Sequence, residues 1–311
     1  MRRSRCSGSA YPHDSGTSSG VHQLIVNPKA GKGNAKANLF TLCNAFCAME
    51  DEVKVFVTQY GNHARQLVEE KAEQFDLLLC CGGDGTWNEV ISGLMKVAQK
   101  PAVAYLPTGT VNDFASTLKL AKSPGKLMEH LATPTPFACD IGQFNKRYFT
   151  YVAAFGLFTE ISYSTPQGSK NTFGKAAYFL EGIKQLTHIP RYHIVLETKD
   201  MRIEEDCIFG CITNSRYVAG FTSITGEHAK LDDGLFEVLL LRVPNNLLDV
   251  QNIITALLKR EVNTTWMHFL TTSALTITCD QAIPWTLDGE DGGSVHCAKI
   301  QNHHKAITIL L

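Results

Sequence analysis

The sequence predicts an α/β fold, in which an N-terminal nucleotide-binding domain with a parallel sheet precedes a β-sandwich domain. The first half of the chain alternates short apolar strands with helical stretches, which is typical of a parallel sheet covered on both faces. Beyond Pro134 and Pro136, strand-like stretches joined by turns dominate, which favours an antiparallel sandwich. The 311 residues suffice for two domains, and we place their boundary near residue 137.

The predicted domains span residues 21–137 and 138–311. Residues 1–20 are rich in Ser and Gly and lack the apolar stretch of a secretion signal, so we expect a disordered tail. Strands of the first domain are expected at 22–28, 53–59, 76–81 and 102–107, and helices at 36–50, at 62–75, in a stretch ending at 97, and at 112–120. Loops that follow parallel strands meet at one edge of the sheet, where ligands bind in such folds.

The second domain is expected to be rich in strands. They are predicted at 148–157, 192–198, 205–214, 234–243, 273–280, 294–300 and 306–311. Two helical patterns interrupt them, at 175–189 and at 245–262.

Composition excludes several classes of protein. The net charge of −1 arises from 29 basic and 30 acidic residues, so no overall positive field would attract nucleic acid. No apolar run approaches the roughly 18 residues that span a bilayer, so any membrane contact has to be local and peripheral. The ten cysteines form no CxxC pair and no zinc-type spacing; we interpret them as core residues of a cytoplasmic protein.

A glycine-rich loop follows the strand at 76–81. Its sequence is Gly82-Gly83-Asp84-Gly85-Thr86, and a helical stretch begins directly after it. Glycines let backbone N–H groups approach a bound anion, and the helix points its positive end at the same place. Asp84 beside a phosphate requires a divalent cation or water between them, which indicates a metal-bound nucleotide. A plain tight turn between strand and helix is the alternative.

Two further loops at the same predicted edge have a similar composition. Residues 27–33 (NPKAGKG) follow the first strand, and residues 107–114 (PTGTVNDF) follow the strand at 102–107. Neither matches the P-loop pattern or GxGxxG, so the predicted phosphate site would be of another kind.

The motifs of this chain, taken together, resemble those of the diacylglycerol kinase catalytic family. IVNPKAGKG, GGDGTWNEV, PTGTVNDFA, KLDDGLFEV and WTLDGEDG occur in the order that this family shows. The chain is most similar to the soluble bacterial lipid kinases, which are related to sphingosine kinases. The resemblance runs from about residue 22 to the C-terminus. It implies an α/β nucleotide domain, a β-sandwich domain and an active site between them, with ATP and Mg²⁺ as cofactors.

The resemblance also implies roles for individual residues. ATP would lie against Asn27, Gly82, Gly83, Gly85, Thr86, Thr108, Gly109, Thr110 and Asn112. Asp84 would belong to a Mg²⁺–water network, with Asp113 and Asp140 in support. A second, structural Mg²⁺ would be bound by the side chain of Asp233 and the carbonyls of Lys230 and Leu235, because hard oxygens suit this ion. A solvated turn without metal is the alternative for this stretch.

Two carboxylates of the second domain are candidate catalytic groups. Phosphorylating an alcohol needs a group that takes the hydroxyl proton, and the resemblance assigns this role to Asp288, with Glu290 beside it as a ligand of metal or water. An Asp-Gly hairpin turn is the alternative, and both readings can hold together. The prediction requires Asp84 and Asp288 to face a common cleft.

The sequence therefore predicts an ATP- and Mg²⁺-dependent kinase of a membrane lipid, with diacylglycerol as the favoured acceptor and phosphatidic acid as the product. Another lipid alcohol (a sphingoid base or phosphatidylglycerol), a soluble metabolite, or a nucleotide-binding regulator without turnover are the alternatives. A homodimer is possible. One departure from the family stands out: Ser116 and Thr117 occupy the place where an arginine is expected, so a phosphate-facing cation is missing.

Overall fold

The computed structural model describes residues 20–31, 35–157, 190–214, 217–218, 221–222, 230–259, 261 and 265–311. The predicted tail at 1–20, except for residue 20, and the helix predicted at 175–189 lie outside the described residues. So do the last two residues of the loop predicted at 27–33.

Four parallel strands form the sheet of the first half. They pair in the order β4-β3-β1-β2, and every pairing among them is parallel. Their bounds are β1 Val21–Val26, β2 Glu52–Val57, β3 Leu77–Gly82 and β4 Ala102–Pro107. All six residues of β3 are buried, because helices cover this part of the sheet on both faces. The predicted order of strands and helices agrees with the structure as far as α4 (Asp113–Thr117), whereas helix α5 at Pro124–Ala132 was not predicted.

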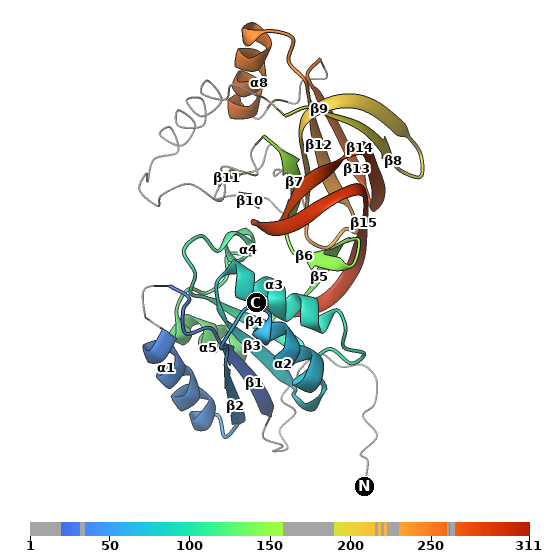
Figure 1. Ribbon diagram of the computed structural model, residues 1–311. Coiled ribbons are helices and arrows are strands. Elements are labelled where there is room, and N and C mark those ends of the chain that lie inside the picture. Colours follow the sequence, from blue (N-terminus) through green and yellow to red (C-terminus); the bar gives the residue numbers. More distant parts are fainter. Residues whose placement is uncertain are drawn as a thin grey trace.

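Helices cover this sheet on both sides (Figure 1). Their bounds are α1 Ala35–Ala48, α2 His63–Lys71, α3 Asp84–Leu94, α4 Asp113–Thr117 and α5 Pro124–Ala132, with a 3₁₀ turn η1 at Ala72–Gln74. Helices α1 and α5 pack into one apolar cluster with the sheet, and α2, α3 and α4 pack into another. The two clusters use alternate residues of the strands, as the pleat of a sheet requires.

The second half is built mainly of antiparallel strands, as its pattern predicts. The strands are β5 Pro136–Phe144, β6 Arg147–Phe149, β7 Val152–Gly156, β8 Tyr192–Glu197, β9 Arg202–Thr213, β10 Tyr217–Val218, β11 Phe221–Thr222, β12 Phe236–Arg242, β13 Met267–Thr272, β14 Ala274–Leu287 and β15 Glu290–Leu310. Helix α8, Leu247–Lys259, lies within the helical pattern at 245–262. These strand pairings do not by themselves establish a β-sandwich, so the β-sandwich stays a prediction.

The long strand β15 connects the two halves. Two separate strands were expected, at 294–300 and 306–311, but a single strand runs through both, with an irregularity near Lys305, whose φ is +51°. Close to its end, Ile309 pairs with Val103 of β4 in parallel, so the C-terminal residues extend the first sheet. Strand pairing thus continues from one half into the other, and the boundary predicted near residue 137 falls within β5.

Two further observations bear on the sequence predictions. Cys80, Cys139 and Cys207 are buried and unpaired, as expected of core cysteines, whereas Cys47 is exposed. Among the described residues, no helix has both the length and the apolar character that crossing a bilayer requires.

Trp87 fixes helix α3 against the sheet. It is fully buried and stacks on Tyr105 of β4 at 4.6 Å and on Phe114 of α4 at 5.0 Å between ring centroids. The hydroxyl of Tyr105 also donates to the carbonyl of Gly82, where β3 ends and the glycine-rich loop begins, at 3.3 Å. The position of the glycine-rich loop therefore depends on this aromatic cluster.

Trp87→Ala is expected to lower the free energy of unfolding by about 3–5 kcal/mol, because it removes a buried indole and leaves a cavity. Urea denaturation followed by circular dichroism measures the loss. The matched control is Phe40→Ala on α1, whose side chain is 77% exposed and whose loss should cost less than about 0.5 kcal/mol. Equal losses in the two variants would contradict the role given to the cluster.

Candidate active site

Three loops meet at the carboxyl edge of the parallel sheet, as predicted. Asn27, which follows β1, donates from Nδ2 to Oγ1 of Thr86 at 2.8 Å. The backbone N–H of Thr108, after β4, donates to the carbonyl of Gly82 at the end of β3 at 2.8 Å. These contacts join segments that lie up to about eighty residues apart in the sequence into one surface.

Glycines allow these loops to approach each other at backbone distance. A Cβ on Gly109 would lie 2.6 Å from Cα of Gly83 and 2.8 Å from Oδ1 of Asn112. Gly31 has a φ of +70°, and a Cβ there would collide with the carbonyl oxygen of Thr108. Side chains are thus excluded where the loops touch, which leaves main-chain groups to form the surface.

Helix α3 begins inside this surface. Its N-cap is Gly83, which has no side chain to accept a hydrogen bond, so the N–H groups of the first turn receive no side-chain cap. A helix start of this kind binds anions through those N–H groups and through the helix dipole. Thr86 lies in the same turn and is oriented by Asn27.

The β4–α4 loop is held by the side chain of Asn112. This residue has a φ of +55°, accepts from the N–H of Gly109 at 3.0 Å and donates to the Gly109 carbonyl at 2.7 Å. Its amide therefore shapes the loop from within. The residues that the loop presents outward are Thr110 and Val111, both exposed.

Asp84 occupies an electrostatically strained position at the start of α3. One oxygen accepts from the N–H of Asp113 at 3.3 Å, and the other, Oδ1, is buried without a hydrogen-bond partner. Burial, together with the neighbouring carboxylate of Asp113, raises the pKa of Asp84 to about 6. A buried oxygen without a partner, beside a second carboxylate, fits a bound cation.

Asp288 lies at the turn between β14 and β15, where five donors bind its carboxylate. The φ values of Asp288 and Gly289 are +50° and +81°, so this Asp-Gly pair makes the tight hairpin turn that its sequence indicates. The donors are the N–H of Thr150 (2.7 Å), Oγ1 of Thr150 (2.9 Å), the N–H of Tyr151 (2.9 Å), the N–H of Val152 (3.0 Å) and Nδ2 of Asn88 (2.7 Å). The hairpin turn and the candidate catalytic carboxylate are therefore the same feature.

The charge of Asp288 is buried, with only 4% of the residue exposed. Burial raises the pKa of Asp288, while the hydrogen bonds from Thr150, Tyr151, Val152 and Asn88 act in the opposite sense. The carboxylate is thus held in one orientation and has a greater proton affinity than an exposed aspartate.

The hairpin turn of the second half lies against helix α3 of the first. A Cβ on Gly85 would lie 3.3 Å from Oε1 of Glu290, and the charge of Asp288 contributes to the raised pKa of Asp84. Asp84 therefore shares one site with Asp288 and Glu290, which lie some two hundred positions further along the chain.

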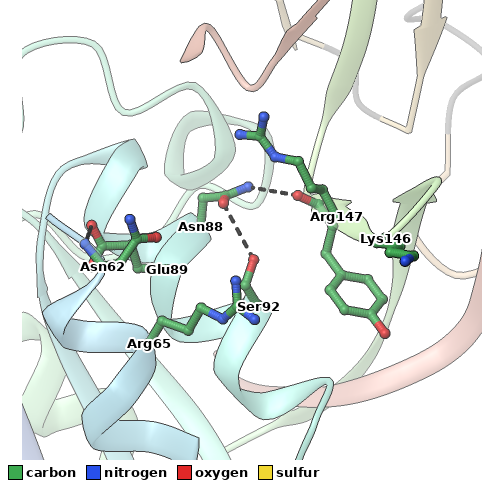
Figure 2. Close-up of a pocket in the computed structure, with 8 residues that line it drawn as sticks. Asn62, Arg65, Asn88, Glu89, Ser92, Lys146 and Arg147 are labelled. Carbon is green, nitrogen blue, oxygen red and sulfur yellow. Dashed lines mark hydrogen bonds between the residues drawn. The ribbon is translucent and has the colours of Figure 1, made fainter. Parts of the chain in front are cut away.

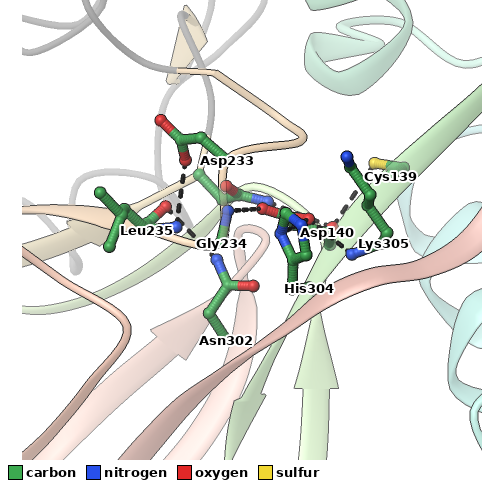
Figure 3. A network of polar contacts seen from close by, with 9 residues as sticks. Cys139, Asp140, Asp233, Gly234, Leu235, Asn302, His304 and Lys305 are labelled. Atoms are coloured by element: carbon green, nitrogen blue, oxygen red, sulfur yellow. Dashed lines mark hydrogen bonds and ion pairs between the residues drawn. The ribbon is translucent and has the colours of Figure 1, made fainter.

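The predicted structural metal site is a turn with an internal network of polar contacts (Figure 3). Both oxygens of Asp140 accept backbone hydrogen bonds, from the N–H of Gly234 at 2.6 Å and the N–H of Lys305 at 2.7 Å, and His304 Nδ1 lies 3.2 Å from Oδ1. Asp140 thus fixes the turn through main-chain groups.

The remaining predicted ligands lie on the turn itself. Asp233 accepts from the N–H of Leu235 at 3.0 Å, and the Leu235 carbonyl accepts from Asn302 Nδ2 at 3.3 Å. Lys230 is exposed at the start of the turn. Among the described residues, no group of three or more His, Cys, Asp or Glu side chains has a geometry suited to a metal ion. The structural metal at this turn stays a prediction.

The donors to Asp288 were not predicted from the sequence. Thr150 and Tyr151 carry no recognisable motif, and they are found only because β7 pairs with the end of β14. Asn88 carried a signal, since it follows the glycine-rich loop by one helical turn in GGDGTWNEV. Beside Asn88 is a polar pocket between the two halves of the chain (Figure 2), lined by Asn62, Arg65, Asn88, Glu89, Ser92, Lys146, Arg147 and Tyr148.

Comparison with known proteins identifies relatives along most of the chain. The family profile described as "Diacylglycerol kinase catalytic domain" matches residues 22–144. The diacylglycerol kinase of Bacillus subtilis (strain 168) is 28% identical over 277 residues, which cover 87% of this chain and 90% of the relative. That of Staphylococcus epidermidis (strain ATCC 12228) is 30% identical over 279 residues, covering 88% and 86%.

The fold is also similar to that of solved structures. A crystal structure of a diacylglycerol kinase from Bacillus anthracis superimposes with a TM-score of 0.72 at 21% identity, and the match covers 94% of this chain and 97% of the other. At this level of identity the similarity shows a shared fold.

Replacing Asp84 by asparagine tests its electrostatic strain. The pKa of folded Asp84, about 6, lies above the ordinary value of 3.8, so the folded state binds the additional proton and the free energy of unfolding decreases as pH rises through this interval. In metal-free buffer, Asp84→Asn should be more stable than the wild type at neutral pH by about 1–3 kcal/mol, and this advantage should shrink on acidification. Urea denaturation across this range measures the difference. A stability difference that does not change with pH, or an Asp84→Asn variant less stable than the wild type, would contradict the raised pKa of Asp84.

Proposed function

Because the chain belongs to the diacylglycerol kinase family, and is therefore a lipid kinase, we propose that it transfers the γ-phosphoryl group of ATP to the hydroxyl of diacylglycerol, giving phosphatidic acid. The observation that carries this proposal is the contact between the anion-binding start of helix α3 and the Asp288–Glu290 turn. Phosphoryl transfer needs a phosphate site and a proton acceptor at a common cleft, and these two segments supply both.

The ATP phosphates are proposed to lie at the start of α3. The main-chain N–H groups there are uncapped, and the close approach of Gly83 and Gly109 keeps side chains away from them. Thr86, Thr108 and Thr110 add hydroxyl groups, of which Thr108 Oγ1 is buried without a partner. Main-chain N–H donors would thus replace the arginine that the family has where this chain has Ser116 and Thr117.

Magnesium is proposed to bind next to Asp84. Its first ligand would be Oδ1 of Asp84, which is buried and has no hydrogen-bond partner among the described residues, and the carboxylates of Asp113 and Glu290 lie nearby. When bound, Mg²⁺ would neutralise charge on the transferring phosphoryl group. The role of the protein is to gather these carboxylates at the phosphate-binding end of α3.

Asp288 is proposed to take the proton of the acceptor hydroxyl. Burial raises its pKa, which makes it a stronger base than an exposed carboxylate, and its five donors set its orientation. The acceptor hydroxyl has to replace one donor. The Thr150 hydroxyl suits this exchange, since the hydroxyl can rotate away while the Thr150 N–H keeps its hold on the same oxygen.

Contact with the membrane is proposed to be peripheral and to lie near the β4–α4 loop. Val111 is 57% exposed in that loop, between the phosphate-site residues Thr110 and Asn112. An apolar side chain beside the cleft would bring the site to the bilayer surface, where the lipid substrate is located. We propose that this surface is the cytoplasmic one; self-association as a homodimer stays a prediction.

The purified protein incubated with labelled ATP, Mg²⁺ and mixed micelles should convert diacylglycerol into phosphatidic acid, identified by chromatography. Sphingoid base, phosphatidylglycerol and a soluble nucleotide acceptor are tested in parallel. Asp288→Asn should lower kcat by about 10²- to 10⁴-fold, because it removes the proton acceptor. Asp280→Asn, an exposed carboxylate elsewhere in β14, is the matched control and should keep wild-type kcat. ATP binding without transfer to any acceptor would favour a regulator without turnover.

Gly109→Ala should raise KM for ATP by about ten- to a hundredfold, because the added methyl group forces the β3–α3 and β4–α4 loops apart. Steady-state kinetics at saturating lipid measures it. Gly125→Ala in α5, where a Cβ meets nothing within 4 Å, is the control and should leave KM unchanged. An unaltered KM in Gly109→Ala would show that ATP does not use this junction.

A further inference from the structure

Helix α3 contacts the second half of the chain through one face. Gly85, Asn88 and Ser92 are spaced by three and four residues, so they line one side of the helix. Gly85 lies against Glu290, and Asn88 reaches Asp288 and the β5–β6 hairpin. This face of α3 therefore joins the phosphate-binding turn to the carboxylate that is proposed to accept the proton.

Asn88 differs from the other donors to Asp288 in its origin. Thr150, Tyr151 and Val152 belong to the second half and move with Asp288, whereas Asn88 belongs to α3. Asn88 follows Asp84 by four residues, which is about 6 Å along a helix. The hydrogen bond from Asn88 at 2.7 Å thus sets Asp288 at a fixed distance from the start of α3.

The surroundings of Asn88 determine how its amide is oriented. The amide nitrogen faces two acceptors, Oδ2 of Asp288 at 2.7 Å and the carbonyl of Tyr148 at 3.2 Å. The amide oxygen accepts from the Ser92 hydroxyl at 3.4 Å, and Figure 2 shows Asn88 between Ser92 and the β5–β6 hairpin. Every partner matches an amide, and a carboxylate at this position would set oxygen against oxygen.

We propose that Asn88 is a positioning residue for phosphoryl transfer, which holds the Asp288 carboxylate at the correct distance from the nucleotide bound at the start of α3. This inference rests on the proposed function and adds a geometric requirement to it. The helix that binds the phosphates also places the proton acceptor. A displacement of the second half relative to α3 would therefore break the Gly85–Glu290 and Asn88–Asp288 contacts together. This geometric requirement applies to the transfer step. Loss of the Asn88–Asp288 hydrogen bond should therefore leave the affinity for the nucleotide unchanged.

Asn88→Ala and Asn88→Asp test the proposal. Both should lower kcat about 10- to 100-fold, the effect of losing a hydrogen bond to a charged group, with KM for ATP unchanged within about threefold. Asn88→Asp is nearly isosteric, so its loss would report the chemistry of the donor rather than its volume. The assay is the labelled-ATP transfer to diacylglycerol, with thermal unfolding of each variant measured alongside.

Glu89→Gln is the matched control. Glu89 is the next residue of α3, and its carboxylate accepts from the N–H groups of Asn62 and Ala64 at the start of α2. These hydrogen bonds do not involve Asp288. This variant should lose stability and keep kcat. Wild-type kcat in Asn88→Asp, or a fall in kcat matched by an equal rise in KM for ATP, would overturn the positioning role. A wild-type protein that phosphorylates no lipid would instead overturn the proposed function.

Discussion

The hydrogen bonds to the carboxylate of Asp288 connect almost every functional part of this molecule. Four of the five come from Thr150, Tyr151 and Val152 where β7 begins, and one comes from Asn88 on helix α3. A buried carboxylate without such partners would be too costly to keep ionised. A charged Asp288 therefore requires both the strand pairing of the second half and the contact of this half with α3.

The first half forms its surface at the carboxyl edge of the sheet largely from main-chain groups. Its three loops touch through glycines, and the first turn of α3 is left uncapped. Trp87, Tyr105 and Phe114 stack on one another, and the Tyr105 hydroxyl donates to the Gly82 carbonyl at the start of the glycine-rich loop. If the nucleotide binds as proposed, this main-chain surface would hold the phosphates without the arginine expected near Ser116.

Local patterns in the sequence were sufficient for the parallel sheet and for the glycine-rich edge. Apolar runs that alternate with helical stretches specify the strands, and loops after parallel strands must share an edge. Pairings between distant segments were not visible, because no local pattern encodes them: β15 joining β4, and Tyr151 meeting Asp288, depend on tertiary packing. The amide of Asn88 was conspicuous in the sequence, yet its partner lies 200 residues away.

The central claim is that one cleft holds both the nucleotide and the Asp288 carboxylate. A crystal structure with Mg²⁺ and a non-hydrolysable ATP analogue tests it most directly. The account predicts the triphosphate on the N–H groups at the start of α3, with the metal on Asp84 and the terminal phosphate facing Asp288. A nucleotide bound elsewhere, or a terminal phosphate separated from Asp288 by protein, would contradict it.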